Sequence, residues 1–268
     1  MRGLRVVAAI PPRRLRQHAL VIGMADLGFG ERNALPVVSS ENFREHRMSS
    51  PTPNASVYAC ESSRTIGSWS ISAGKRTFDA MIAGTALIFV LPFMAVIGIL
   101  VKITSTGPVL FRQQRVGQRG RAFTLLKFRS MAVNSDKSSK LTCSGDPRVT
   151  PVGKFLRKTK LDELPQLYNV VRGDMSLVGP RPDMPEYIAT LSPSLSEALL
   201  LRPGITSVAS IEFADEEAIL AQVPPDQLHS FYTETLLPRK IALDLEYARS
   251  STFVKDLKVI ARTVGVMF

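Results

Sequence analysis

The sequence predicts an α+β fold in which one long apolar helix is followed by a compact, mainly helical domain with a short β-hairpin. Three features support this prediction. The segment Ala80–Val101 carries no charge and is long enough for a helix of roughly 33 Å. The segments Val109–Arg115 and Phe123–Arg129 have the composition of strands and flank a turn at Gly117–Gly120. Apolar residues recur at helical spacing in Thr252–Phe268.

The first predicted domain, residues 1–72, is expected to be a disordered N-terminal extension. It contains polar, proline-containing stretches such as Ser49–Asn54 and shows no sustained hydrophobic period. We expect no signal peptide, because the apolar run Val6–Ile10 ends at two prolines. Met24 and Met48 are alternative translation starts.

The second predicted domain, residues 73–103, contains the apolar segment and is expected to insert into a membrane. Pro92, near the middle of the segment, removes a backbone hydrogen bond and bends a helix. A spanning helix usually has its basic residues on the cytoplasmic side, whereas here basic residues flank both ends, namely Lys75, Arg76, Lys102, Arg112 and Arg115. Both features favour a re-entrant helix, bent at Pro92, that enters and leaves by the cytoplasmic face. The alternative is a kinked spanning helix.

The composition indicates a basic protein that meets an anionic partner, since the formal net charge is +11. The apolar segment favours a membrane as that partner. We expect no nucleic-acid partner, because the sequence has neither an aromatic stacking pattern nor a recognisable reading helix. Cys60 and Cys143 are far apart, and the chain has three histidines, so neither a zinc site nor a disulfide framework is expected. The two thiols fit a reducing cytosolic face.

Cationic side chains gather in the third predicted domain, residues 104–268. The alternation of side chains along a strand places Lys127 and Arg129 on one face of the hairpin. Arg157 lies in a predicted short helix, and Arg181 lies between two prolines, where a rigid backbone suits a bidentate contact with phosphate. Each cation alone is compatible with a surface salt bridge. Their concentration predicts an anion site.

Two adjacent carboxylates, Asp162 and Glu163, lie among these cations at the predicted start of a short helix that ends at Gly173. A carboxylate held near cations and a helix N-terminus is expected to stay ionised, and it can attack phosphorus or hold a metal. The alternative is structural, because an aspartate at the N-cap and a glutamate in the first turn stabilise a helix without any chemistry.

The segment Leu161–Pro182, L-D-E-L-P-Q-L-Y-N-V-V-R-G-D-M-S-L-V-G-P-R-P, closely resembles the signature of the bacterial sugar transferases, the monotopic polyprenyl-phosphate hexose-1-phosphate transferases. Four further segments resemble the family in the same order: Lys75–Asp79, Gly107–Gly117, Phe123–Met131 and Arg202–Ser207. The resemblance covers about residues 73–268, and an ordered series is more specific than a single motif. The stretch Ser207–Leu220 departs from the family's commonest pattern, so the resemblance does not fix the sugar.

The resemblance implies a phosphoglycosyl transferase that moves a hexose 1-phosphate from a nucleotide sugar, expected to be a UDP-sugar, to undecaprenyl phosphate. This reaction is the first membrane step of polysaccharide or glycoconjugate assembly, including exopolysaccharide biosynthesis. The resemblance also implies a re-entrant helix in the bacterial inner membrane, with the catalytic domain on the cytoplasmic face. The alternative function is a non-catalytic membrane-bound scaffold, against which the intact carboxylate pair argues. A homo-oligomer is compatible with the sequence.

The resemblance also assigns roles to single residues. Asp162 is the expected nucleophile, which forms a phosphosugar-aspartyl intermediate, and Glu163 is the expected Mg²⁺ ligand. The cations expected to bind the substrate phosphates are Lys127, Arg129, Arg157 and Arg181. Asp244 and Tyr247, from the family's C-terminal Asp/Tyr region, are further substrate-site candidates.

The last predicted helix, in Thr252–Phe268, carries basic residues on its other faces. It is expected either to lie on anionic lipid as an interfacial helix or to be a core helix with one solvated face.

Overall fold

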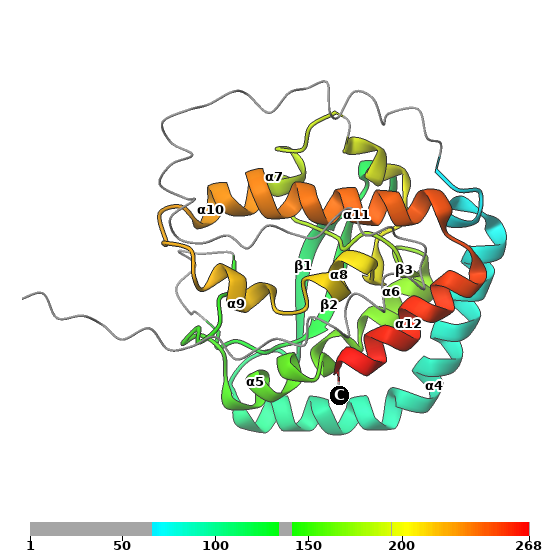
Figure 1. Cartoon of the computed structure of the whole chain (residues 1–268). Helices are drawn as coiled ribbons and strands as arrows, with labels where there is room; N and C mark the ends of the chain where they lie inside the picture. Colours follow the sequence, from blue (N-terminus) through cyan, green and yellow to red (C-terminus); the bar gives the residue numbers. More distant parts are fainter. Residues whose placement is uncertain (1–65, 134–140, 194, 268) are drawn as a thin grey trace, which may run out of the picture. The chain divides into compact units, whose positions relative to one another are not determined.

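The computed structural model describes residues 66–133, 141–193 and 195–267, so the expected extension lies outside the described residues as far as residue 65. The described part is mainly helical (Figure 1). Its helices are α4 (Ala73–Thr104), α5 (Pro151–Lys158), α6 (Gln166–Arg172), α7 (Pro185–Ile188), α8 (Val208–Glu212), α9 (Glu216–Leu220), α10 (Leu228–Phe231), α11 (Leu237–Ser250) and α12 (Phe253–Met267). Its single turns are η2 (Trp69–Ile71), η3 (Gln118–Gly120), η4 (Leu161–Glu163), η5 (Ser196–Leu200) and the π-helical η6 (Tyr232–Leu236).

The predicted hairpin is confirmed. Strands β1 (Leu110–Val116) and β2 (Ala122–Phe128) pair antiparallel, with Leu110 opposite Phe128 and Val116 opposite Ala122. A second pair was not predicted: β3 (Ser176–Val178) and β4 (Gly204–Thr206) form a short parallel ladder. Segments of three residues are too short to show an alternation of apolar and polar side chains, so these strands could not be predicted from the sequence.

Helix α4 contains the apolar segment and continues through Pro92 without a break. Figure 1 shows that the helix changes direction along its length, and a proline inside a helix, here Pro92, is one of the established causes of a bend. Among the described helices, α4 is the one long and apolar enough to cross a membrane. The hydroxyl of Ser72 caps its first turn by accepting a hydrogen bond from the N–H of Lys75 at 3.0 Å.

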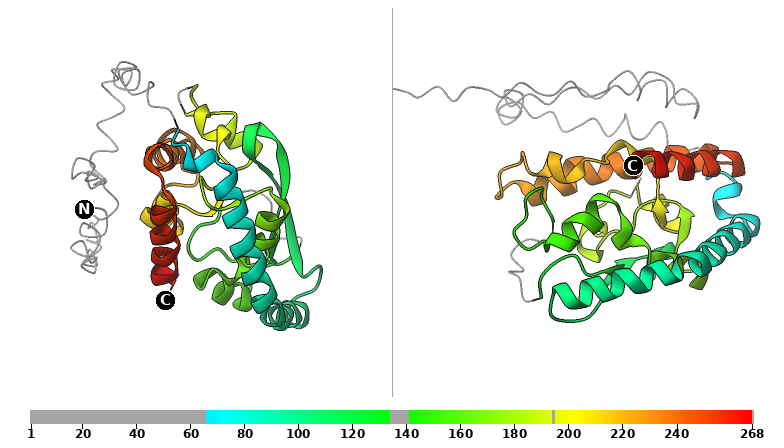
Figure 2. Two further views of the ribbon diagram at one scale, coloured as in Figure 1. Left: turned by 90° about the vertical axis from the view of Figure 1, so that its right-hand side faces the viewer. Right: turned by 90° about the horizontal axis from the view of Figure 1, so that it is seen from below.

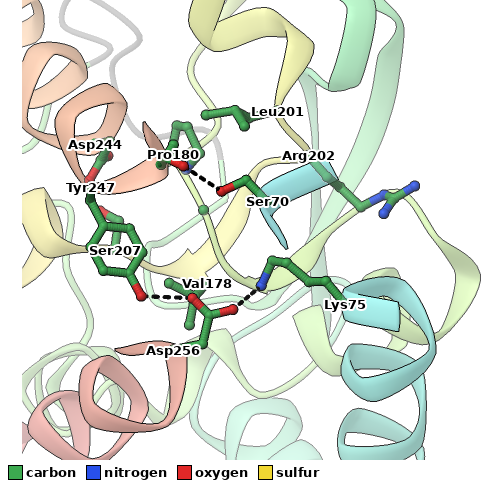
Figure 3. Close-up of a pocket in the computed structure, with 12 residues that line it drawn as sticks. Ser70, Lys75, Val178, Pro180, Leu201, Arg202, Ser207, Asp244, Tyr247 and Asp256 are labelled. Atoms are coloured by element: carbon green, nitrogen blue, oxygen red, sulfur yellow. Dashed lines mark hydrogen bonds and ion pairs between the residues drawn. The ribbon is translucent and has the colours of Figure 1, made fainter. Parts of the chain in front are cut away.

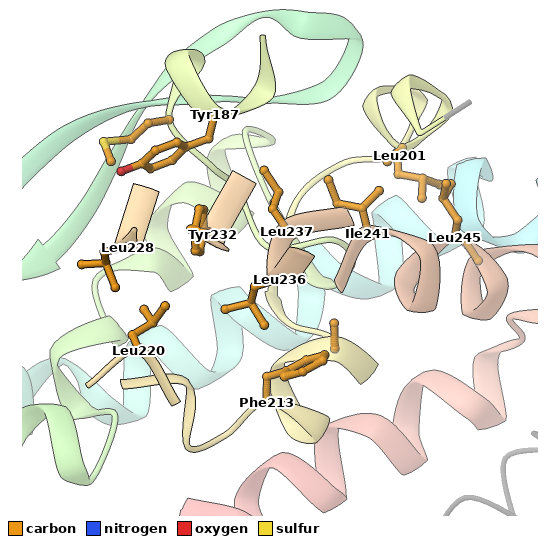
Figure 4. Packing of buried hydrophobic residues seen from close by; sticks show 14 of the residues in the cluster. Tyr187, Leu201, Phe213, Leu220, Leu228, Tyr232, Leu236, Leu237, Ile241 and Leu245 are labelled. Atoms are coloured by element: carbon orange, nitrogen blue, oxygen red, sulfur yellow. The ribbon is translucent and has the colours of Figure 1, made fainter. Parts of the chain in front are cut away.

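Two hydrophobic clusters hold the described elements together. The larger one surrounds α11 and includes Leu237, Ile241 and Leu245, with rings from α7 and η6 packed at one end (Figure 4). The smaller one joins the second half of α4 to β2 and α5. Helix α4 lies on one side and α11 and α12 on the other, with α5, α6 and the strands between them (Figure 2). The carboxylate pair and Lys127, Arg157 and Arg181 lie outside α4, α11 and α12, whereas Asp244 and Tyr247 lie on α11.

The described residues 66–72 fall within the predicted extension, and they are part of the folded unit. Ile66 is buried in the larger cluster, and the N–H of Gly67 donates to the carbonyl of Ala248 at 3.1 Å. The residues directly before α4 are thus packed against α11, not free of the folded unit.

Helix α12 confirms the predicted C-terminal helix. Asp256 and Val259 face the interior, whereas Phe253, Leu257 and Val264 are 42%, 42% and 52% exposed. Most of the predicted apolar stripe is therefore outside the core, which favours the interfacial alternative over a plain core helix.

Candidate active site

The carboxylate pair lies in the turn η4, directly before α6. Lys160, two residues before Asp162, has a left-handed backbone conformation with φ 55°. This conformation is uncommon for residues other than glycine, asparagine and aspartate. The N-cap of α6 is Pro165, so the predicted helix start near Asp162 was three residues early. Asp162 therefore does not cap α6, although it lies in the first turn of η4.

Helix α6 is fixed from two sides, and it holds the turn in place. The side chain of Asn169 donates to the carbonyl of Thr124 at 2.9 Å and accepts from the N–H of Leu126 at 3.1 Å, which joins α6 to β2. Arg76 donates to the carbonyls of Val170 and Val171 at 2.7 and 2.8 Å. A cation at these last carbonyls satisfies groups that a helix C-terminus leaves unpaired. Arg76 belongs to the segment Lys75–Asp79 that resembles the family, and no role at the site was expected for it from the sequence.

Glu163 forms a two-point ion pair with Arg181. The guanidinium donates to the two carboxylate oxygens at 2.7 and 3.4 Å. Burial opposes the ionisation of Glu163, but Arg181, with Lys160 and Lys127, outweighs it and lowers the pKa of Glu163 to about 2. Glu163 is therefore a fixed negative charge at neutral pH, and the structure brings it together with Arg181 as the sequence predicted.

Asp162 is 5% exposed, and its Oδ1 has no hydrogen-bond partner among the described residues. Burial and the charge of Glu163 raise the pKa of Asp162 to about 6, against the opposing effects of Lys127 and Arg157. Nearby cations were expected from the sequence to keep Asp162 ionised, but that expectation did not include its burial, which is the largest effect on its pKa. The group still ionises below neutral pH. A buried, unpaired carboxylate oxygen is rare without a function.

Lys127 lowers the pKa values of both carboxylates of the pair. Burial lowers the pKa of Lys127 to about 8, and Asp162 and Glu163 partly offset this effect. Its Nζ lies 5.3 Å from the centre of the Phe111 ring, on the opposite strand of the hairpin. A partly desolvated ammonium of this kind binds an incoming phosphate more strongly than a solvated one.

Arg157 reaches the same region from α5 and influences the pKa values of both Asp162 and Lys127. In the structure its guanidinium is paired with Glu217 of α9. This ion pair is partly exposed, so breaking it costs little free energy, and an anionic substrate can take the place of Glu217 at Arg157.

Arg129 has a different environment from the other predicted phosphate-binding residues. Its guanidinium donates to the carbonyls of Pro108 and Ser105, with 2.7 Å to the latter, and to the hydroxyl of Ser105 at 2.7 Å. The residue is 5% exposed and ties the end of α4 to the hairpin. Nη1 and Nη2 of Arg129 are occupied by backbone carbonyls and a hydroxyl, whereas its Nε has no partner among the described residues, so its role in phosphate binding stays a prediction.

Asp244 and Tyr247 lie on α11, where both are buried beside a small cavity (Figure 3). Asp244 accepts from the N–H of Ala209 at 3.0 Å and from the backbone N–H of Arg181, and burial raises its pKa to about 7. The hydroxyl of Tyr247 donates to Asp256 at 2.7 Å. The cavity that both residues line has a volume of about 20 Å³, which is room for roughly one water molecule and not for a sugar. Both candidates are thus supporting residues in this structure.

Asp162 and Glu163 fit a metal ion that binds together with the phosphates of the substrate. Mg²⁺ usually keeps several waters and uses one or two carboxylates in addition to substrate phosphates. The unpaired Oδ1 of Asp162 and the ionised Glu163 supply such donors. No group of three or more His, Cys, Asp or Glu side chains in the described ranges could hold a metal without substrate.

Comparison with known proteins gives a consistent picture. A sequence model described as bacterial sugar transferase matches residues 70–268. An undecaprenyl-phosphate glucose phosphotransferase of Komagataeibacter xylinus is 36% identical over 75% of this chain, which spans 37% of that protein. A UDP-glucose:undecaprenyl-phosphate glucose-1-phosphate transferase of Caulobacter vibrioides is 36% identical over 71% of this chain and 68% of its own length. A UDP-N-acetylgalactosamine-undecaprenyl-phosphate N-acetylgalactosaminephosphotransferase of Aeromonas hydrophila is 42% identical over 71% of this chain and 42% of its own.

Proposed function

Because the chain belongs to the bacterial sugar transferase family, we propose that it transfers a hexose 1-phosphate from a UDP-sugar to undecaprenyl phosphate through a covalent intermediate on Asp162. The observation that carries the proposal is the buried Asp162, whose Oδ1 is unpaired beside a Glu163 that Arg181 holds ionised. The named relatives make UDP-glucose and UDP-N-acetylgalactosamine the first donors to test.

In the first step, an oxygen of the Asp162 carboxylate attacks the sugar-bearing phosphorus of the UDP-sugar. The bond from this phosphorus to the bridging oxygen breaks, and UMP leaves with that electron pair. In the second step, an oxygen of the lipid phosphate attacks the same phosphorus. The bond to Asp162 breaks, which yields undecaprenyl diphosphate hexose and restores the carboxylate.

The surrounding residues stabilise the charge that moves in these steps. Lys127 and Arg157 bind the diphosphate near Asp162, and Arg181 orients Glu163 and the phosphate that approaches it. Glu163 and Asp162 would hold Mg²⁺, which supplies positive charge for the pyrophosphate and the leaving group when bound.

A re-entrant α4 belongs to the proposal. On one side of Pro92, Asp79 and Ala83 are buried against the folded unit, and on the other side Ile97 and Val101 are buried against it. A helix that crossed the hydrocarbon core, about 30 Å thick, would carry one of these contacts away from the domain. Packing at both ends supports a helix that enters and leaves by one face, with the catalytic part on the cytoplasmic side of the bacterial inner membrane.

The product chemistry suits the start of polysaccharide assembly, and the test of the proposal is direct. The full chain in membranes is incubated with undecaprenyl phosphate and each UDP-sugar, and UMP release and lipid-linked sugar are measured. With UDP-sugar alone, wild type should release up to one equivalent of UMP and gain a phosphosugar mass on Asp162. Asp162→Asn keeps the shape and should lose both signals. Transfer by Asp162→Asn at the wild-type rate would refute the nucleophile assignment.

A further inference from the structure

We propose that Asp183 and Tyr232 are positioning residues that fix the direction in which Arg181 points toward Glu163, a role that rests on the proposed function of this site. Neither residue was singled out from the sequence. Both are buried, with exposed fractions of 6% and 3%. They are 49 residues apart in the sequence, and the hydroxyl of Tyr232 meets the Asp183 carboxylate two residues after Arg181.

The turn of Arg181 is anchored on its N-terminal side by the parallel ladder. The N–H of Gly179 donates to the carbonyl of Thr206 at 3.0 Å, and the N–H of Gly204 donates to the carbonyl of Pro180 at 2.9 Å. A proline on each side of Arg181 restricts its backbone further. Asp244 also accepts from the backbone N–H of Arg181. The residues that hold the C-terminal side of the turn restrict the direction of the side chain further.

Asp183 provides that hold through both its backbone and its carboxylate. Its carbonyl accepts from the N–H of Val116 at 3.0 Å, and Arg115 of β1 donates to the carbonyl of Pro182 and to the Asp183 carboxylate at 3.3 Å each. The hydroxyl of Tyr232 lies 3.1 and 3.0 Å from the two carboxylate oxygens. This carboxylate thus links the hairpin, the π-helical turn η6 and the turn of Arg181.

Tyr232 is itself held by two neighbouring side chains. The ring of Tyr187 lies 4.9 Å away between centres (Figure 4). The Nζ of Lys240 lies 5.7 Å from the centre of the Tyr232 ring. Lys240 is paired with Glu216 at 2.8 Å. Tyr232 opens the π-helical turn, and π-helical turns occur frequently at functional sites. The hydroxyl therefore has little freedom to leave Asp183.

The consequence for the proposed reaction follows from geometry. Arg181 contacts both oxygens of Glu163, so rotation of its turn changes the position of the guanidinium and of Glu163 together. A displacement of about 1 Å in such a group can lower a rate by about 100-fold. Asp183 and Tyr232 do not reach the substrate themselves, and they act through Arg181.

The test is a double-mutant cycle on the full chain. Tyr232→Phe removes one hydroxyl and is expected to lower kcat/KM for the UDP-sugar by about tenfold and to weaken UDP binding in calorimetry by a similar factor. Asp183→Asn should lower both further. Tyr187→Phe removes the neighbouring hydroxyl, which makes no hydrogen bond to Asp183 within the described residues, and should leave both quantities unchanged. In an Arg181→Ala background, Tyr232→Phe should have no further effect.

These outcomes separate the two proposals. If the wild-type chain turns over no UDP-sugar, the proposed function is refuted. The double-mutant cycle can then still be measured with UDP affinity as the readout, and that result decides the role of Tyr232. A general loss of stability would lower the amount of active enzyme and leave KM and the UDP affinity unchanged, so that result overturns the inference. It is also overturned if Tyr232→Phe costs the same factor with and without Arg181, or if it has no effect on either quantity.

Discussion

Replacing Lys75 with methionine is expected to lower the melting temperature of the folded unit by about 6–20 °C. Nζ of Lys75 lies 2.6 Å from Asp256 and 3.5 Å from Asp79, and none of the three side chains is more than 8% exposed. Methionine fills most of the volume but leaves two buried carboxylates without their cation. Breaking a buried ion pair on one side costs about 3–5 kcal/mol. Each kcal/mol lowers the melting temperature of a domain of this size by about 2–4 °C.

The molecule carries its own probe for this measurement. Trp69 is the single tryptophan of the chain, and its Nε1 donates to Asp256 at 2.8 Å. Tryptophan fluorescence of the detergent-solubilised protein therefore reports on the same cluster as temperature rises. The matched control is Lys102→Met, at the other end of α4, where the exposed ammonium reaches only the carbonyl of Gly107 at 3.3 Å. Its shift should stay below about 2 °C.

The direction in which a second substitution, Asp256→Asn, changes the melting temperature distinguishes a charge effect from a packing effect. In the Lys75→Met background, Asp256→Asn should raise the melting temperature, because it removes one of the two uncompensated charges. In wild type the same change should lower it, because it weakens the ion pair and the hydrogen bond from Tyr247. Equal shifts for Lys75→Met and Lys102→Met would refute the reasoning, and so would the same sign for Asp256→Asn in both backgrounds.

Three further predictions concern the reaction and the membrane. The transfer rate should fall about tenfold between pH 7 and pH 5, because the pKa of Asp162 is about 6 and its ionised form is lost as the pH falls through that value. A kcat/KM that does not change with pH, in protein that fluorescence shows to be folded, would contradict this. A strong chelator should abolish transfer, added Mg²⁺ should restore it, and Glu163→Gln should need more Mg²⁺ for half-maximal rate, whereas full turnover in chelator would exclude a metal. Cysteines placed at the exposed ends of α4, Ala73 and Thr104, in a chain without its native cysteines, should both resist an impermeant maleimide in intact spheroplasts and react after lysis; labelling of either in intact spheroplasts would indicate a spanning helix.

The elements that the sequence predicted best are those with local signals. The glycine turn and flanking β-rich segments located the hairpin within one residue at each end. Helical spacing placed α12, and the short basic helix before the carboxylates appears as α5. The parallel pairing of β3 with β4 was missed because it joins two distant segments of three residues, and such pairing depends on tertiary contacts, not on local pattern.

In the site, residue type was predictable and burial was not. The spacing of Asp162, Glu163 and Arg181 in a family-like segment identified the pair and its cation, and the structure brings Glu163 and Arg181 together. The increase in the pKa of Asp162 was not anticipated, because it comes mainly from burial, which depends on tertiary packing that no local pattern reveals. Arg129 shows the same limit, since alternation gives the face of a strand but not what lies opposite that face.

The segment Lys75–Asp79 changes the argument for the topology of α4. From the sequence, Lys75 and Arg76 counted as cytoplasmic charges at a membrane boundary. In the structure Lys75 faces the buried Asp256, Arg76 caps α6, and Asp79 accepts from Ser176 at 2.5 Å. These cations are used inside the folded unit, so their presence before α4 is explained by packing whichever way the helix runs. The re-entrant proposal therefore rests on the burial of both halves of α4 against one domain and on Pro92 between them, and no longer on flanking charge.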